Sequence, residues 1–291
     1  MIRPGGTILP VFTVVLAIVM IWYLAAVLLN AAWAIDRAEK AGQDLTKAEL
    51  VSETLSQDRP RLPAPHQVVI EIWETTAEKK ITSKRSLIYH GWVTLSATLL
   101  GFVFGAGLGM LLAVAIVHDR ATDLSVMPLV IGSQTIPILA LAPMIIVVLN
   151  AVGLSGLIPK AIISAYLSFF PVAVGMVSGF RSPAAYELDL MKTYNANRMQ
   201  LFWKLRVPAS TPFLFPSLKV AIAASLVGAI VGELPTGAVA GLGARLLVGS
   251  YYGQTVQIWS ALVVAATLAA ALVTLMGAAE RLTRRAMGTP P

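Results

Sequence analysis

The chain has 291 residues, of which 57% are hydrophobic and only 13% charged, and its mean hydropathy is +0.76. Soluble domains usually carry about 25% charged residues, so this composition is typical of a membrane protein. The absence of cysteine excludes disulfides and cysteine-bound metals, the widely spaced histidines predict no metal site, and the scattered basic residues behind the net charge of +7 do not predict nucleic-acid binding.

Six apolar stretches are long enough to cross a bilayer, which takes roughly 20 residues per helix. The sequence therefore predicts an all-α integral membrane protein with six transmembrane helices. The first stretch is too long for a signal peptide and lacks a clear cleavage site, so we expect an uncleaved anchor over residues 1–33. The six stretches are 8–33, 92–117, 127–149, 157–177, 212–231 and 258–276.

Residues 34–86, between the first two stretches, are expected to form a periplasmic segment with short helices. An amphipathic helix is predicted over 38–55. The segment RPRLPAP (59–65) predicts a stiff extended chain, since each proline fixes φ and disfavours helix at the preceding residue. Apolar residues on one side of 66–77 predict a short helix on the membrane surface. For 34–58 a solvated spacer is an open alternative.

The distribution of lysine and arginine predicts that both termini lie in the cytoplasm. With the N-terminus inside, the cytoplasmic segments hold ten basic residues, whereas the two short outer loops hold two, Lys160 and Arg245. The long first outer loop, 34–91, holds nine basic and nine acidic residues and is the least decisive. Cytoplasmic loops of membrane proteins are enriched in lysine and arginine, which favours this orientation. The ten residues are Arg3, Arg120, Arg181, Lys192, Arg198, Lys204, Arg206, Arg281, Arg284 and Arg285.

The chain carries none of the common motifs for nucleotide binding or hydrolysis. It has no G-x-x-x-x-G-K-[ST], no H-E-x-x-H and no G-x-S-x-G. Ionisable residues are nearly missing from the apolar stretches, whereas carriers driven by ions tend to place acidic residues near the bilayer centre. We therefore expect no catalytic residue, no bound cofactor and no energy source within this chain.

A polar, basic segment over 186–208 (YELDLMKTYNANRMQLFWKLRVP) separates the fourth and fifth apolar stretches. Its apolar residues follow helical spacing, with an interruption around Asn195 to Asn197. Because asparagine tolerates left-handed backbone, this pattern predicts two short helices joined at a turn and ended before Pro208. Such a unit is able to insert into a partner's groove, and an ordinary connecting loop is the alternative. The spaced residues are Leu188, Met191, Met199, Phe202 and Leu205.

The same segment resembles the coupling loop of permease subunits in bacterial binding-protein-dependent ABC importers. That pattern begins with Glu-Ala-Ala, has a glycine six residues after the glutamate, and ends in an apolar residue and a proline thirteen residues after the glycine. When the segment is aligned on Pro208, Asp189 takes the glutamate position and Asn195 the glycine position. The two alanines are replaced by Leu190 and Met191. The aspartate keeps the charge, and asparagine is enriched in left-handed backbone.

Further similarity to the sulfonate, taurine, nitrate and pyrimidine-precursor permeases covers about residues 62–282. It implies a five-helix type I importer core over 87–282 with a coupling loop at 184–208 and a tail at 283–291, in a bacterial inner membrane. The similar stretches are LPAPHQVVIEIW (62–73), TLSATLLGFVFGAGLGMLLAVAI (94–116), PILALAPMIIVVLNAVGLSGLIPK (137–160) and GAIVGELPTGAVAGLGARLL (228–247).

The resemblance implies a division of labour between several subunits. Two permease chains, expected here as a homodimer in membrane lipid, form the pore, and a cytoplasmic ATPase dimer holds the ATP and magnesium. A periplasmic or lipid-anchored solute-binding protein delivers a small organic solute. Residues 242–257 look closest to permeases for riboflavin or pyrimidine-type heteroaromatics, and a sulfonate- or nitrate-like solute is the alternative. An ion-coupled carrier and a membrane scaffold without a pore are the competing functions.

Two groups of residues are expected to carry this function. The ATPase contact is expected at Asp189, Asn195, Ala196, Arg198 and Pro208. Along the solute path, the polar run Ser133, Gln134 and Thr135 and the acidic Glu233 are expected, because polar groups inside a bilayer tend to face a cavity or another helix. For the serine and threonine, helix packing is the alternative, and for Glu233 it is a loop cap.

Overall fold

The computed structural model describes residues 8–42, 46–235 and 240–288, and every regular element within them is helical. Arg3, which the charge count assigns to the cytoplasm, lies outside these ranges. The chain forms two compact units. One contains Met1–Tyr89 and Arg245–Val264, and the other contains His90–Ala244 and Ala265–Pro291.

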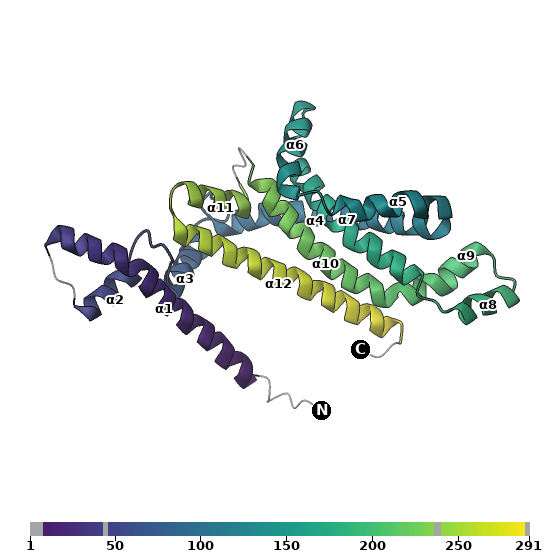
Figure 1. Cartoon of the computed structure of the whole chain (residues 1–291), viewed down its shortest axis with the longest axis horizontal. Helices are drawn as coiled ribbons and strands as arrows, with labels where there is room; N and C mark the ends of the chain where they lie inside the picture. Colours follow the sequence, from purple (N-terminus) through teal and green to yellow (C-terminus); the bar gives the residue numbers. More distant parts are fainter. Residues whose placement is uncertain (1–7, 43–45, 236–239, 289–291) are drawn as a thin grey trace. The chain divides into compact units, whose positions relative to one another are not determined.

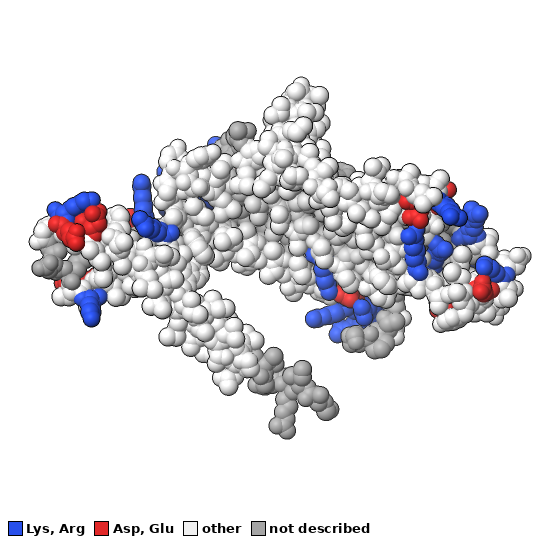
Figure 2. Space-filling view, viewed as in Figure 1, with Lys and Arg blue, Asp and Glu red and all other residues white. Residues whose placement is uncertain are grey.

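Among the described residues, five long helices are apolar enough to cross a membrane. Figure 2 shows, on its visible face, the charged side chains gathered around α2, around the α8–α9 region and near the C-terminal end of α12, with little charge elsewhere on the long helices. Charge at helix ends and apolar residues between them are what a bilayer requires. The five helices are α1 (Ile8–Ala41), α4 (Leu87–His118), α7 (Leu157–Phe180), α10 (Val207–Glu233) and α12 (Thr255–Ala286) (Figure 1).

Shorter helices connect these spans. Two of them are single π-helical turns, η1 and η2, which follow α3 and α9 directly. The shorter helices are α2 (Lys47–Leu55), α3 (Pro65–Trp73), η1 (Glu74–Glu78), α5 (Arg120–Ser133), α6 (Ile138–Ala151), α8 (Ala185–Thr193), α9 (Arg198–Leu201), η2 (Phe202–Arg206) and α11 (Leu242–Tyr251).

The third predicted span, 127–149, is a broken pair of helices instead of one straight helix. α5 and α6 are bent by 100° at a short break. Pro137 sits at the start of α6 in extended backbone, has no N–H to donate and disfavours helix at Ile136. The Ser133 carbonyl at the end of α5 instead accepts a hydrogen bond from the Tyr166 hydroxyl of α7. The six predicted stretches therefore correspond to five long helices and this pair.

The helix predicted over 38–55 is split in two. α1 continues to Ala41, and α2 begins only at Lys47. Thr46 caps α2, because its hydroxyl accepts from the Glu49 N–H while the Glu49 carboxylate accepts from the Thr46 N–H at 2.9 Å. The next predicted helix, 66–77, corresponds to α3 and η1, and it follows residues 56–64, which are not helical.

The helical path does not end before Pro208, contrary to the prediction. α9, η2 and α10 run on from Arg198 to Glu233 as one path of 36 residues. The π-helical turn η2 lies immediately before the proline. Pro208 has no N–H to donate, and its ring needs space next to the preceding turn. The wider π-helical turn provides this space, so the helix continues through Pro208.

Glycine and serine bring α4, α7 and α10 into close contact. A Cβ on Gly175 of α7 would overlap the Ser217 hydroxyl of α10, and a Cβ on Gly228 of α10 would lie 2.7 Å from the Ser164 Cα of α7. Ser225 of α10 donates to the Thr98 carbonyl of α4 at 2.7 Å. Small residues and interhelical hydrogen bonds are the usual means of helix association in lipid.

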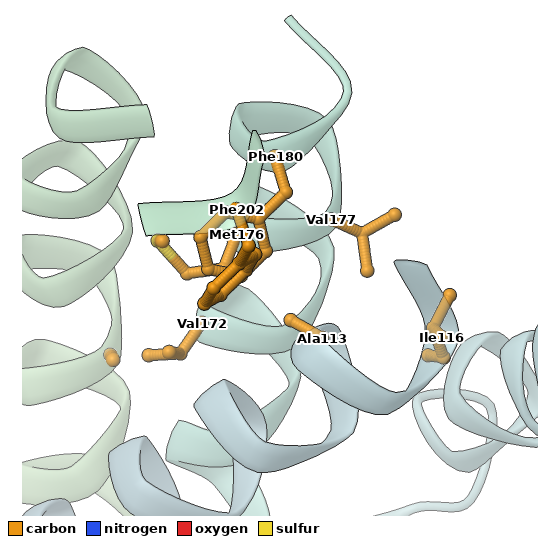
Figure 3. Packing of buried hydrophobic residues seen from close by; sticks show 8 residues of the cluster. Ala113, Ile116, Val172, Met176, Val177, Phe180 and Phe202 are labelled. Carbon is orange, nitrogen blue, oxygen red and sulfur yellow. The ribbon is translucent and has the colours of Figure 1, made fainter. Parts of the chain in front are cut away.

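A cluster of buried apolar side chains lies where the C-terminal parts of α4 and α7 meet η2. Figure 3 shows Ala113 and Ile116 of α4, four residues of α7 and Phe202 of η2 in one cluster. Phe202 is 7% exposed, and its ring lies 5.1 Å from that of Phe180 and 4.8 Å from the His118 imidazole. The segment that precedes α10 is thereby anchored to the helix bundle.

In the other unit, the buried Asn30 of α1 binds the backbone of the segment between α2 and α3. Its Nδ2 donates to the Leu62 carbonyl at 2.9 Å, and its Oδ1 accepts from the N–H groups of Arg61 at 2.8 Å and Leu62 at 3.3 Å. Nearby, the Trp22 indole donates to the Pro63 carbonyl at 2.9 Å. One polar side chain inside the first span therefore orders the extended chain before α3.

A second link in this unit joins α3 to α11. The buried Arg245 guanidinium donates to the Glu71 carboxylate at 3.2 Å. Burial lowers the pKa of Arg245, while the nearby Glu71 carboxylate favours its charged form. The arginine that the charge count assigns to an outer loop is thus a paired structural residue.

Replacement of Asn30 by alanine is expected to loosen residues 54–62. Buried backbone groups would lose their partners at a cost of about 1–3 kcal/mol each, so trypsin cleavage after Arg61 should accelerate at least about tenfold. Limited proteolysis of the purified protein measures this rate. Thr13→Ala, which removes an exposed hydroxyl on the same helix, is the control, and equal cleavage of both variants would contradict the assignment.

Candidate functional site

The predicted ATPase contact lies on a helix–turn–helix formed by α8 and α9. α8 begins where the Ala184 N–H donates to the Glu187 carboxylate at 2.8 Å. Asp189 and Lys192 are both exposed on α8 and pair at 2.8 Å. Asp189, which aligns with the glutamate of the coupling-loop pattern, is therefore accessible to a partner.

Asn195 ends α8 in left-handed backbone, with φ of +52°, and it is the one non-glycine residue with positive φ in the described chain. Its N–H donates to the Lys192 carbonyl at 2.9 Å, and the next N–H, that of Ala196, donates to the Met191 carbonyl at 3.0 Å. This pair of bonds is the Schellman motif, whose left-handed residue is usually glycine. The left-handed asparagine predicted from the sequence is confirmed.

Asn197 then starts the second helix. Its Oδ1 accepts from the Gln200 N–H at 2.8 Å, and the Gln200 side chain accepts from the Asn197 N–H at 3.0 Å. This reciprocal capping satisfies two N–H groups at the start of α9 and places Arg198 in its first turn, exposed to solvent. Asp189 therefore precedes the turn on α8, and Arg198 follows it on α9.

Large apolar side chains are exposed around this turn. Met199, one of the apolar residues at helical spacing, is 64% exposed, and its sulfur accepts from the Trp203 indole at 3.0 Å. The other residues at this spacing are buried or half-buried. Exposed apolar patches on polar segments commonly mark protein contacts. The exposed side chains are Tyr186, Leu190, Tyr194, Met199 and Trp203.

An ion pair supports the base of the segment. Arg181, which follows α7, donates to the Asp123 carboxylate of α5 at 2.7 Å. Together with the buried Phe202, this pair fixes the two ends of the segment to the bundle while its tip stays exposed. Sequence reasoning did not identify Asp123, because an acid and an arginine so far apart in the chain have no recognisable spacing.

The polar run Ser133, Gln134 and Thr135 lies at the break between α5 and α6. The Ser133 hydroxyl donates to the Val130 carbonyl at 2.7 Å, and the Thr135 hydroxyl donates to the Gly132 carbonyl at 2.8 Å. Gln134 and Thr135 are exposed. The break therefore presents polar side chains and helix-terminal backbone at the surface of this unit.

Glu233, the last residue of α10, is fully buried and lies in a separate network. Its carboxylate accepts from the Thr94 hydroxyl of α4 at 2.9 Å and from the Gly243 N–H at 2.9 Å, and it lies 3.6 Å from the Lys160 ammonium group of α7. Sequence reasoning selected Glu233 but missed Thr94 and treated Lys160 as a loop charge. The Gly-Leu-Gly run at 241–243 was the available signal in the sequence, since glycine often marks a place where the backbone approaches a neighbouring group closely.

Comparison with known proteins identifies a matching family. Residues 105–288 match the model of the family described as the binding-protein-dependent transport system inner membrane component. The matched part covers α5 to α12 in full and includes the helix–turn–helix and Glu233, whereas Thr94 of α4 lies before it.

Individual relatives carry permease names. The riboflavin transport system permease protein RibX of Chloroflexus aurantiacus is 32% identical over 76% of this chain and 78% of its own length. The formylaminopyrimidine transport permease protein ThiX of Halalkalibacterium halodurans is 33% identical over 62% of this chain and 68% of its own. The putative aliphatic sulfonates transport permease protein SsuC of Bacillus subtilis is 24% identical over 71% of each. The chain therefore belongs to the inner-membrane permease components of binding-protein-dependent transport systems, the multi-pass membrane subunits of ATP-driven importers.

Proposed function

We propose that the α8–α9 segment is the surface through which a cytoplasmic ATPase drives this permease. The observation that carries the proposal is the group of exposed aromatic and apolar side chains around the turn at Asn195. They surround a segment whose base is anchored to the bundle, and an amphipathic helix with exposed apolar residues is suited to a partner's groove. Figure 1 shows this segment at the end of α10 that is opposite Glu233.

The named residues have distinct roles in this proposal. Asp189 and Arg198 supply charges on either side of the turn, and Asn195 and Ala196 form the turn itself. Pro208 marks the point where the segment enters α10. Because η2 and α10 continue the helical path of α9, displacement of the docked tip would move α10.

The orientation and the partners are part of the same proposal. The charge asymmetry of ten basic residues against two supports cytoplasmic termini and a cytoplasmic α8–α9 segment. ATP and magnesium would then be held by the ATPase dimer, and a periplasmic or lipid-anchored solute-binding protein would act on the opposite face. This chain contributes the pore and no catalytic residue.

A second copy of the chain would complete the solute path. Gln134 and Thr135 are exposed at the break between α5 and α6, where a single chain would present them to lipid. Polar side chains at membrane depth usually face a cavity or another helix, so a homodimer with these residues toward a shared pore satisfies them. Ser133 lies beside them at the end of α5, whereas Glu233 is buried in a separate network at the end of α10.

The solute is proposed to be riboflavin or a pyrimidine-type heteroaromatic. Support comes from the relatives that carry riboflavin and formylaminopyrimidine in their names and are 32% and 33% identical to this chain over the aligned residues. A sulfonate- or nitrate-like solute is the alternative, which the relatives named for sulfonate and nitrate transport support at lower identity.

Charge reversal on the segment tests the ATPase contact. Asp189→Lys combined with Arg198→Glu is expected to lower the affinity for the ATPase that copurifies with the wild-type chain by at least about tenfold, because both charges would face like charges. Quantitative pull-down from solubilised membranes measures the affinity. Arg281→Glu, an exposed cytoplasmic-side charge on α12, is the control, and unchanged binding in the double variant would exclude the proposed contact.

Substitutions of Asn195 test the geometry of the turn. Asn195→Gly is expected to retain thermal stability and ATPase binding, because glycine adopts left-handed backbone freely. Asn195→Val is expected to lose both, because left-handed geometry costs an ordinary residue roughly 1–2 kcal/mol and a β-branched residue more. Thermal unfolding and the same pull-down measure these effects. Equal behaviour of the two variants would contradict the role of the left-handed residue.

Reconstitution tests the solute and the energy source. Proteoliposomes with the copurifying ATPase and the binding protein are expected to take up labelled riboflavin or formylaminopyrimidine in preference to an aliphatic sulfonate or nitrate. Uptake should stop without ATP and persist after ionophores remove ion gradients. Uptake that follows the ion gradient would establish a carrier, and absence of flux for all four solutes would contradict the proposed solute classes.

A further inference from the structure

Residues 240–243 are tied to the ends of three helices by a network centred on Glu233. The Gly243 N–H donates to the carboxylate at 2.9 Å, and the Leu242 N–H donates to the Thr94 hydroxyl at 2.9 Å, which itself donates to Glu233. The Lys160 ammonium donates to the Ala240 carbonyl at 3.0 Å while lying 3.6 Å from the carboxylate. Backbone groups of Ala240, Leu242 and Gly243 thus converge on one acid and its partners.

The backbone of these residues passes directly against the Glu233 side chain. A Cβ on Gly241, which has φ of +128°, would overlap the carboxyl group, and a Cβ on Gly243 would lie 2.8 Å from the Glu233 Cβ. Leu242 between them is fully buried. Glycine at 241 and 243 is therefore required by the close approach to the carboxyl group.

Burial makes this network cooperative. Glu233 is 0% exposed and the Lys160 side chain is 12% exposed, so water has little access to either charge. Removal of one member of a buried ion pair leaves the other uncompensated, which is strongly destabilising. The network consequently holds as a unit and keeps α4, α7, α10 and residues 240–243 in one arrangement.

The position of Glu233 along the chain connects this network to the α8–α9 segment. The helical path from Arg198 to Glu233 is unbroken over 36 residues, or roughly 54 Å at the usual helical rise. Its first residue lies beside the Asn195 turn, and its last residue is the acid that binds residues 240–243. A displacement at one end therefore reaches the other through a single helix.

We propose that Glu233 is a positioning residue for transport, which binds residues 240–243 to the end of α10 so that they move with this helix when the α8–α9 segment is displaced. The inference rests on the proposed ATPase contact only for the source of the movement. The attachment of residues 240–243 to Glu233 stands on the hydrogen bonds and the buried ion pair.

Cysteine labelling provides the test, because the natural chain has no cysteine. Leu242→Cys introduces one thiol at a buried position, and its reaction with a maleimide is measured on the complete complex in nanodiscs, with and without a non-hydrolysable ATP analogue. In the otherwise unchanged chain, labelling is expected to be slow and to differ between the two nucleotide conditions. Glu233→Gln in this background should accelerate labelling at least about tenfold and abolish its nucleotide dependence.

Thr94 supplies a matched pair of variants that leaves the acid in place. Thr94→Val removes the bridging hydroxyl with little change in shape and should behave like Glu233→Gln, whereas Thr94→Ser keeps the hydroxyl and should retain slow labelling. Each variant is compared as a monodisperse complex, and the ATPase rate of that complex is recorded. A merely structural defect would lower the ATPase rate and the yield of complex. Loss of positioning would leave the ATPase rate unchanged and abolish the dependence of thiol labelling on nucleotide.

The possible results separate the two proposals. Labelling of Glu233→Gln and Thr94→Val at the original rate would overturn the attachment of residues 240–243 to Glu233. Fast labelling that still depends on nucleotide would overturn transmission through this residue. If no ATPase accompanies the unchanged chain, the proposed ATPase contact fails, while the labelling rates without nucleotide still decide whether Glu233 holds residues 240–243.

Discussion

Close contact between α7 and α10 is the constraint on which both candidate sites depend. Inside a bilayer, apolar surface gains little from leaving lipid, so helices associate through small residues and hydrogen bonds. Gly175, Gly179 and Gly228 leave no room for a Cβ against the facing helix, and the Ser164 hydroxyl binds the Ser225 carbonyl across the interface. This contact sets Lys160 beside Glu233 at one end and Phe180 beside Phe202 at the other.

The two ends of α10 differ in their relation to water, and this difference explains their chemistry. At the α8–α9 end, charges and aromatic side chains are exposed, so individual ion pairs there add little to stability and remain available to a partner. At the Glu233 end, the acid and Lys160 are shielded, so the same types of charge hold backbone in a fixed position. A further pair, Lys219 with Glu280 at 2.6 Å, joins α10 to α12 between these ends.

Asn30 and the α5–α6 break show how polar groups are accommodated next to lipid. Asn30 lies in the apolar part of α1, and its side chain is satisfied by the backbone of residues 54–62. At the break, the freed Ser133 carbonyl receives the Tyr166 hydroxyl. In both places a backbone that is not helical is tolerated because a side chain from a neighbouring helix completes its hydrogen bonds.

The sequence by itself determined the class of protein, the number of apolar stretches and the position of the α8–α9 segment. These depend on local composition and spacing: long apolar runs must be helices in lipid, and two asparagines between helical patterns predict a turn. The family followed from the same segment, because its acidic, left-handed and proline positions are separated by fixed numbers of residues.

Only the tertiary structure decided which distant residues meet. No spacing in the chain joins Thr94 and Lys160 to Glu233, or Asn30 to Leu62, because these contacts arise from packing between helices. The sequence also could not predict that the helix continues through Pro208 but breaks before Pro137. Proline disfavours helix at both sites. A π-helical turn accommodates Pro208 within the helix, whereas the chain bends by 100° at the break before Pro137.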